Sequence, residues 1–213
     1  RNEKNIGIYI CFQVESNEQI LIKAASSFTD RKGAEKNLQK EIAHWNFDRT
    51  HQRLTDIWEK HLAAIQVESP DKEAKQKFYG AFYRASFLPH AFNDVDGRYP
   101  AFAQKDSILQ LAHDEVYYED FSMWDTYRAL HPLINLLYST KAGHMMQSLV
   151  HKSEQGGWLP IFPCWNSYTA AMIGDHCIAA IGDACIKDIR NFDIEKAYKA
   201  MRKNAFESPA DDK

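Results

Sequence analysis

The chain has 213 residues, of which 45% are apolar and 26% are charged, a composition typical of a globular protein with a substantial core. It carries 26 Lys and Arg against 29 Asp and Glu, and the net charge of −3 without a basic stripe argues against a nucleic-acid binder. No apolar run approaches the length of about 18 residues that predicts a membrane span. The four cysteines follow no C-x-x-C spacing and are predicted to be buried free thiols: Cys11, Cys164, Cys177 and Cys185.

The first 30 residues predict strands. Residues 6–14 and 19–27 are rich in β-branched and aromatic side chains and flank a short polar turn at residues 15–18. Because a lone hairpin is marginal in water, we expect these strands to complete a sheet that begins upstream. No Met or signal region precedes residue 1, and residues 207–213 contain no closing element, so we expect the chain to be part of a longer protein.

From Gly33 onward the apolar spacing becomes helical. It predicts helices over residues 33–45, over residues 48–65 with Asp48 as N-cap, and from Asp71 to Pro89. After a short strand at 116–118, one helix is predicted to carry Trp124, Tyr127, Leu130, Ile134 and Leu137 on its inward side, with a kink or break at residues 131–132. Further helices follow at 141–152, at 170–189, which is apolar enough to be buried on several sides, and around 194–201. We therefore expect a mainly α chain of stacked helical hairpins attached to a β domain.

Two acidic stretches invite a metal interpretation. Residues 94–97 (DVDG) do not fit an EF-hand, because Phe92 and Ala103 would occupy its first and last ligand positions, and a tight turn at Asp96–Gly97 is favoured instead. A second acidic group could host a cation, although a solvated charged loop is the commoner explanation: Asp114, Glu115, Glu119 and Asp120.

Residues 121–128 (FSMWDTYR) carry more information. On a helix, Trp124 and Arg128 are i and i+4 and can stack, while Asp125 and Arg128 are i and i+3 and can pair. An aromatic ring beside a carboxylate suits a sugar, because the ring covers C–H faces and the carboxylate accepts from vicinal hydroxyls. Spacing alone leaves a second interpretation open, and favours it: a core Trp with an ion pair on the helix surface.

The segment from Gly156 to His176 is dense in aromatic and amide side chains. Its glycine loop allows close backbone approach and presents Trp158. Trp165, Asn166, Tyr168 and Asp175 follow within twenty residues, a density that suits carbohydrate but that packing also explains. Asp183 falls on the most apolar predicted helix and is expected to need a polar partner there.

Five blocks in one order resemble the family 92 glycoside hydrolases: FYGAFYR (78–84), DVDGRY (94–99), FSMWDTYRALHP (121–132), EQGGWLP (154–160) and MIGDH (172–176). The resemblance covers roughly residues 30–205. It implies that residues 1–30 end an N-terminal β-sandwich domain and that residues 31–70 form a helical linker. Residues 71–213 would then be the first, incomplete part of an (α/α)6 catalytic toroid.

The activity that this resemblance implies is that of an exo-α-mannosidase. Such an enzyme would release terminal α-linked mannose, with α-1,2 linkages expected, from mannan or N-glycan by calcium-assisted inverting hydrolysis. The family's acid, base and Ca²⁺ ligands are expected beyond Lys213, so no catalytic or metal residue is assigned in this chain, which alone should be inactive. The implied partner is a mannose-containing oligosaccharide, and the implied location is extracytoplasmic, periplasmic or secreted.

Site residues carry over from the resemblance one by one. Asp125 matches the acidic residue that binds hydroxyls of the terminal mannose, and Trp124 should form part of the pocket wall. The further substrate-binding candidates are Arg128, Gly157, Trp158 and Asp175. Residues 162–169 (FPCWNSYT) depart from the sequence expected in this family, which leaves the linkage open. The alternatives are a non-catalytic carbohydrate-binding or helical interaction module and another (α/α)6 hydrolase or lyase.

Overall fold

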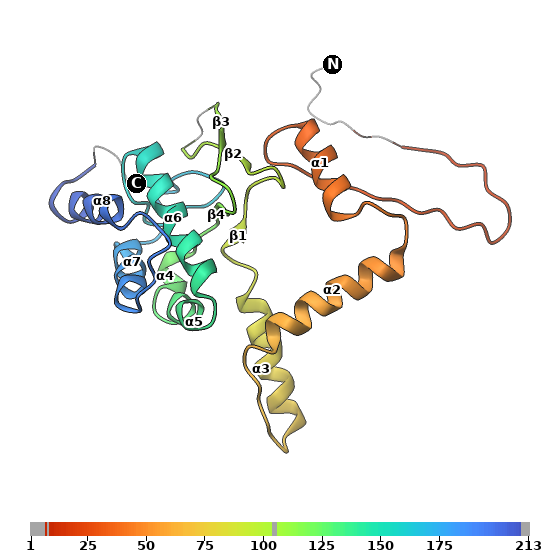
Figure 1. Cartoon of the computed structure of the whole chain (residues 1–213), viewed down its shortest axis with the longest axis horizontal. Helices are drawn as coiled ribbons and strands as arrows, with labels where there is room; N and C mark the ends of the chain where they lie inside the picture. Colours follow the sequence, from red (N-terminus) through yellow and green to blue (C-terminus); the bar gives the residue numbers. More distant parts are fainter. Residues whose placement is uncertain (1–6, 8, 104–105, 210–213) are drawn as a thin grey trace.

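The computed structural model describes residue 7 and residues 9–103 and 106–209. These residues form a mainly helical structure with four short strands. Figure 1 shows the helices after residue 122 gathered in one bundle, while the first three helices form an arm beside it. None of the helices in this part of the chain is both long and apolar enough to cross a bilayer.

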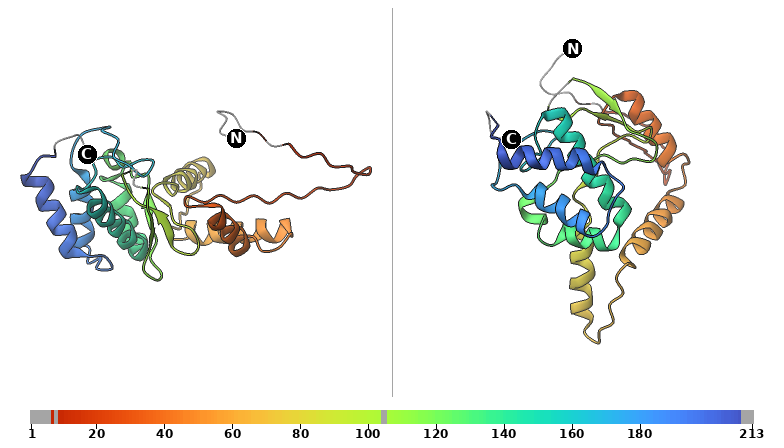
Figure 2. Two further views of the ribbon diagram at one scale, coloured as in Figure 1. Left: turned by 90° about the horizontal axis from the view of Figure 1, so that it is seen from above. Right: turned by 60° about the vertical axis from the view of Figure 1, so that its left-hand side comes forward.

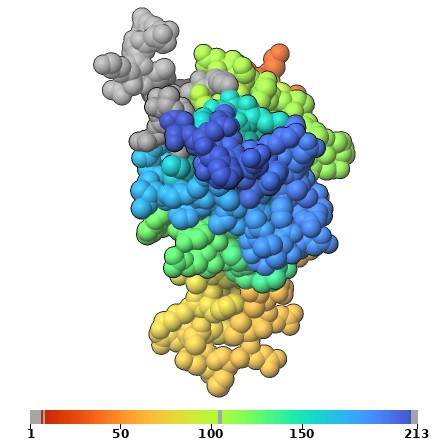
Figure 3. All heavy atoms as spheres, turned by 90° about the vertical axis from the view of Figure 1, so that its left-hand side faces the viewer, coloured from red at the N-terminus to blue at the C-terminus, as the bar shows by residue number. Residues whose placement is uncertain are grey.

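The bundle contains α5 (Leu130–Leu137), α6 (Ser139–Gly156), α7 (His176–Ile186) and α8 (Ile194–Phe206). Helix α6 contacts the other three, and α7 and α8 lie side by side on one face (Figure 3). As predicted, the apolar side chains of α6 and α7 fill the core, and these are fully buried: Met145, Leu149, Cys177, Ala180, Ile181 and Ala184. The expected partner of Asp183 is also present, since its carboxylate accepts from Lys187 Nζ at 2.6 Å and from Asn135 Nδ2 at 2.7 Å.

Helix α7 begins later than the sequence predicted. Residues 170–175 form a loop, because Ala170, Met172 and Gly174 adopt positive φ angles of 49°, 64° and 91° that no helix contains. Met172 and Ile173 are therefore exposed at 51% and 76% instead of packing within a buried helix. The portion from His176 to Ile186 is helical as predicted, and α7 ends three residues before the predicted end at Ile189.

The helix predicted after residue 122 is two helices, α4 (Met123–Thr126) and α5. The break lies just before His131–Pro132, because Pro132 is the third residue of α5, where the missing N–H removes no internal hydrogen bond. The prediction that Trp124 faces inward is wrong. Met123 is the fully buried residue of α4, and Trp124 is 48% exposed.

Two antiparallel ribbons lie between the bundle and the arm (Figure 1). Strand β1 (His90–Ala91) pairs with β4 (Tyr118–Glu119), and β2 (Arg98–Pro100) pairs with β3 (Ile108–Gln110). The strand predicted at 116–118 is therefore displaced toward residue 119. The predicted turn at Asp96–Gly97 is confirmed, since Gly97 has a φ of 80° and its N–H donates to Asp94 O at 2.8 Å.

The arm consists of α1 (Arg31–Glu41), α2 (Phe47–Leu62) and α3 (Lys72–Ala85). Helix α3 starts at Asp71 as predicted, where Asp71 is the N-cap and its Oδ1 accepts from Glu73 N and Ala74 N. Helix α1 ends four residues earlier than predicted. The cap of α2 is Asn46, whose Oδ1 accepts from Arg49 N at 2.9 Å, whereas Asp48 lies within the first turn.

A buried carboxylate joins the arm to the ribbons. Asp94 is 1% exposed, and its Oδ2 accepts from Ser27 Oγ at 2.7 Å and from Thr29 Oγ1. Its Oδ1 accepts from Asn37 Nδ2 of α1 at 2.8 Å. The segment before α1, α1 itself and the loop after β1 therefore meet at one side chain, against which Gly33 packs too closely for a Cβ atom.

The N-terminal segment does not form the two predicted strands at the described positions 7 and 9–27; positions 6 and 8 lie outside the described residues. The turn is present, with Asn17 at a φ of 67° and Glu18 N donating to Glu15 O. Residues 9–20 run extended and exposed (Figure 2), because none of the described residues pairs with them in a sheet, whereas residues 21–24 lie beside residues 42–50. Cys11 lies here and is exposed, so the prediction of buried thiols holds for Cys177 but not for Cys11; all four cysteines are free.

Candidate functional site

Helix α4 presents two candidate residues to solvent. Phe121 and Met123 are fully buried, which anchors the start of the helix and leaves Trp124 and Asp125 exposed. Phe121 N also donates to Pro163 O at 3.0 Å, which ties α4 to the loop that precedes α7. An exposed indole beside an exposed carboxylate suits a sugar ring.

Arg128 does not make the predicted contacts. Because α4 ends at Thr126, the i, i+4 geometry with Trp124 is lost. Arg128 Nη2 instead donates to Tyr127 Oη at 3.0 Å, and the guanidinium lies 5.6 Å from the centre of that ring. The alternative of a core Trp with a surface ion pair is also wrong, since Trp124 is exposed and the described side chains of Asp125 and Arg128 form no salt bridge.

Gly157 and Trp158 follow the end of α6. Gly157 closes the helix with a φ of 92°, and its N–H donates to Ser153 O at 2.8 Å. Trp158 is held on both sides of its peptide, because Tyr168 Oη accepts from its N–H at 3.2 Å and donates to its carbonyl at 2.8 Å. Lys203 Nζ lies 4.3 Å from the centre of the Trp158 ring.

Asp175 occupies the N-cap position of α7 without a capping bond from its side chain. Burial raises the pKa of its carboxyl group above the usual range. Asn204 of α8 donates to Asp175 Oδ1 at 3.4 Å and to Leu159 O at 2.9 Å, and it accepts from Leu159 N at 3.2 Å. Asn204 therefore connects the start of α7 with the loop that carries Trp158.

A ring stack completes the connection between the candidate segments. Tyr127 and His176 are nearly parallel, at 9°, with centroids 4.0 Å apart, and they join the turn after α4 to α7. The six candidate residues thus lie on three segments that Tyr127, His176 and Asn204 link. Sequence reasoning assigned no role to Asn204, and no motif marks it, while Tyr127 was interpreted only as a residue of an inward helix face.

The acidic group at 114–120 is not a uniformly solvated loop. Glu119 and Lys152 are both fully buried and form an ion pair. Lys152 Nζ also donates to Tyr117 Oη at 2.6 Å and to Tyr118 O at 3.0 Å. Burial lowers the pKa of Lys152 to about 8, and the Glu119 carboxylate opposes that shift.

The metal interpretation of these carboxylates gains no support. Across residues 7, 9–103 and 106–209, no group of three or more His, Cys, Asp and Glu side chains is arranged to hold a metal ion. These side chains therefore do not fit a calcium site.

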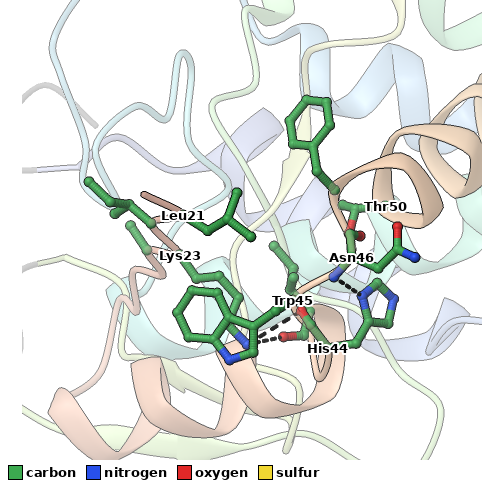
Figure 4. A pocket seen from close by; sticks show the side chains of 10 residues that line it. Leu21, Lys23, His44, Trp45, Asn46 and Thr50 are labelled. Carbon is green, nitrogen blue, oxygen red and sulfur yellow. Dashed lines mark hydrogen bonds between the residues drawn. The ribbon is translucent and has the colours of Figure 1, made fainter. Parts of the chain in front are cut away.

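A separate cavity lies in the arm, between residues 21–24 and 42–50 (Figure 4). Lys23 Nζ donates to Ile42 O at 3.0 Å and lies 4.3 Å from the centre of the Trp45 ring. No carboxylate lines this cavity, and it contains none of the candidate residues. It therefore lacks the carboxylate that Asp125 offers on α4.

Comparison with known proteins decides the family. Residues 33–213 match the family model of the glycosyl hydrolase family 92 catalytic domain. The chain belongs to glycosyl hydrolase family 92. No curated protein matches it.

Solved family 92 structures share the fold. The α-mannosidase BT3965 of Bacteroides thetaiotaomicron, also solved with mannoimidazole, is 32% identical with a TM-score of 0.80, over 87% of this chain and 24% of that protein. The inverting mannosidase BT2199 of the same organism is 27% identical with a TM-score of 0.77, over 87% of this chain and 25% of that protein. The chain therefore spans about a quarter of the length of these family 92 structures.

Proposed function

We propose that the whole protein is an exo-α-mannosidase that releases terminal α-linked mannose from mannan or N-glycan by calcium-assisted inverting hydrolysis. The observation that carries this proposal is the family 92 match over residues 33–213, which includes every candidate site residue. The solved relatives are mannosidases by name, and one of them binds mannoimidazole. We propose α-1,2-linked mannose as the substrate and an extracytoplasmic location for the protein.

In this proposal the exposed pair on α4 binds the terminal sugar. The Asp125 carboxylate accepts from two vicinal hydroxyls, and the Trp124 ring covers an apolar C–H face. The links through Tyr127, His176 and Asn204 support a common pocket, because they hold α4 close to Asp175 and Trp158. Each hydrogen bond to a charged acceptor would contribute about 1.5–3 kcal/mol.

The catalytic acid and base are proposed to lie outside these 213 residues, so that the chain alone is inactive. An inverting glycosidase needs two carboxyl groups about 6.5–9.5 Å apart, with a water between one of them and the sugar. The Ca²⁺ ligands are proposed to lie in the same remaining part of the protein. Residues 71–213 would then begin an (α/α)6 toroid, and residues 31–70 would link it to a β-sandwich that ends at residue 30.

The first experiment is release of mannose by the whole protein from a panel of α-linked mannobioses, with calcium and then with EDTA. We expect release from the α-1,2 isomer, loss of release with EDTA and recovery on adding calcium. Release that resists EDTA would retain the mannosidase and remove the metal from the proposal. No release from any isomer in the presence of calcium would contradict the proposed function.

A matched pair of variants tests the role of Asp125. Asp125→Ala in the whole protein should reduce turnover at least about tenfold, because a charged hydrogen bond to the sugar is lost, while the thermal midpoint stays nearly unchanged. Asp56→Ala removes a carboxylate that is also exposed but lies on α2, and it should leave turnover unchanged. Equal turnover in the two variants would refute the role given to Asp125.

A further inference from the structure

The loop between α6 and α7 presents an aromatic side chain that the proposed site does not use. Trp165 is 84% exposed. It and Asn166 are consecutive non-glycine residues with positive φ angles of 54° and 55°. The turn is closed by Cys164 N donating to Ser167 O at 3.2 Å and by Ser167 N donating to Cys164 O at 3.1 Å. Backbone of this kind persists only where surrounding structure enforces it.

Two neighbouring carboxylates hold the turn from beneath. Asp120 Oδ1 accepts from Trp165 N at 2.9 Å, and Glu119 Oε1 accepts from Asn166 N at 3.0 Å. The buried Asn166 side chain adds two bonds, from Nδ2 to Pro100 O at 3.0 Å and to Ala101 O at 2.9 Å. The peptide groups on either side of the indole are therefore fixed while the ring itself remains in solvent.

The anchor of this turn reaches into the core. Glu119 is fully buried and is paired with Lys152, so its position is fixed by a charge partner as well as by packing. Tyr117 Oη donates to Asn166 Oδ1 at 3.1 Å and belongs to the same network. A large apolar side chain is normally buried, yet this buried polar network fixes the backbone of Trp165 so that its indole lies in solvent. A role for the ring at the surface accounts for this arrangement.

The turn lies next to the candidate sugar site. Asp120, which holds Trp165, precedes Trp124 by only four residues, a length of chain that spans at most about 14 Å. Phe121 N donates to Pro163 O at 3.0 Å, so the two segments also touch on the other side of the turn. The backbone of the Trp165 turn therefore lies beside the start of the segment that carries Trp124 and Asp125.

We propose that Trp165 is a stacking platform for the mannose unit adjacent to the terminal one. This inference rests on the proposed function and extends it to the substrate beyond the bond that is cleaved. The surroundings favour a sugar over a protein surface, since Trp165 is followed by the polar Asn166 and Ser167 and its N–H is held by the Asp120 carboxylate. His90 Nδ1, 3.6 Å from Asp120 Oδ2, adds a further polar group.

The test compares two substrates in the whole protein. α-Mannosyl fluoride occupies only the terminal position, whereas α-mannobiose also presents the adjacent sugar. Trp165→Ala should raise KM for α-mannobiose at least about fivefold, a stacking contribution of ordinary size, and leave kcat and the α-mannosyl fluoride kinetics unchanged. Trp165→Phe should restore part of the loss. Trp45→Ala, which removes an exposed indole from the arm, is the control.

Trp165→Ala would overturn the platform if it left KM for α-mannobiose unchanged or if it changed the kinetics of both substrates equally. A fall of several degrees in its thermal midpoint would also overturn the platform, because it would mean that the indole packs against other parts of the protein. Quenching of tryptophan fluorescence by α-mannobiose gives a readout that needs no turnover. Trp165→Ala should reduce this quenching, and the part that remains comes from Trp124 in the terminal site. If the wild type released no mannose, the proposed function would fail, yet quenching that Trp165→Ala reduces would still support the platform. Quenching of the same size in the variant would overturn it.

Discussion

Replacing Lys152 by Met should destabilise the 213-residue chain by about 3–5 kcal/mol, the usual effect of leaving a buried charge without its partner. Lys152 and Glu119 are both fully buried and paired. The substitution also removes the donor to Tyr117 Oη at 2.6 Å and to Tyr118 O at 3.0 Å. Methionine fits the same space, so a large effect would come from the lost charge and donors and not from a cavity.

A double-mutant cycle separates the energy of the Lys152–Glu119 ion pair from the other effects of replacing Lys152. Glu119→Gln removes the charge of the carboxylate and keeps an oxygen to accept from Asn166 N, a bond of 3.0 Å. In the double variant with Lys152→Met no unpaired charge remains, so its destabilisation should fall short of the sum of the single variants by at least about 2 kcal/mol.

The assay is urea unfolding at pH 7, followed by circular dichroism and tryptophan fluorescence. Lys199→Met is the matched control, because Lys199 also pairs with a glutamate, Glu195 of α8, but with 70% of its side chain exposed. This variant should change the free energy of unfolding by no more than about 0.5 kcal/mol. If Lys152→Met cost less than about 1 kcal/mol, or if the single effects simply added, the buried ion pair would not be the anchor described above.

Two further predictions concern the bundle and the arm. Burial lowers the pKa of His131 to about 4, so between pH 6.5 and pH 4 the unfolded chain binds a proton that the folded chain does not. The free energy of unfolding should therefore fall by about 3 kcal/mol as the pH falls through that range. Urea titrations at several pH values should show this fall in the wild type and not in His131→Phe. In the arm, Gly33→Ala places a Cβ against the Asp94 carboxylate and 2.5 Å from Ser27 Oγ and should cost about 1–3 kcal/mol. Gly182→Ala in α7 meets open space and should stabilise by up to about 1 kcal/mol; similar thermal midpoints for the two alanine variants would show that the contact at Gly33 relaxes freely.

Sequence patterns predicted those parts of the fold in which local rules and burial agree. The start of a helix at Asp71 and the inward face of α6 follow from the local sequence, and both are present. The family could be recognised because several blocks occur in one order, and the match over residues 33–213 confirms it. Whether Asp125 binds a sugar stays a prediction.

The failures occur where contacts distant in sequence override the local pattern. Trp124 has the spacing of an inward helical residue, but the break after Thr126 and the burial of Met123 turn it outward. Glu119 looked like one acid of a solvated loop, because its partner Lys152 lies on another element, 33 positions away. Nothing in the composition of residues 170–175 announces the positive φ angles that delay the start of α7.

The carboxylate of Asp94 also bears on where the chain can be cut. The family match begins at residue 33, yet Asp94 Oδ2 draws both of its hydroxyl donors, Ser27 and Thr29, from before that point. A polypeptide trimmed to the matched region would keep only the amide of Asn37 against a buried negative charge. The contacts that satisfy this carboxylate therefore begin upstream of the boundary that similarity defines, with residues that the family match leaves outside.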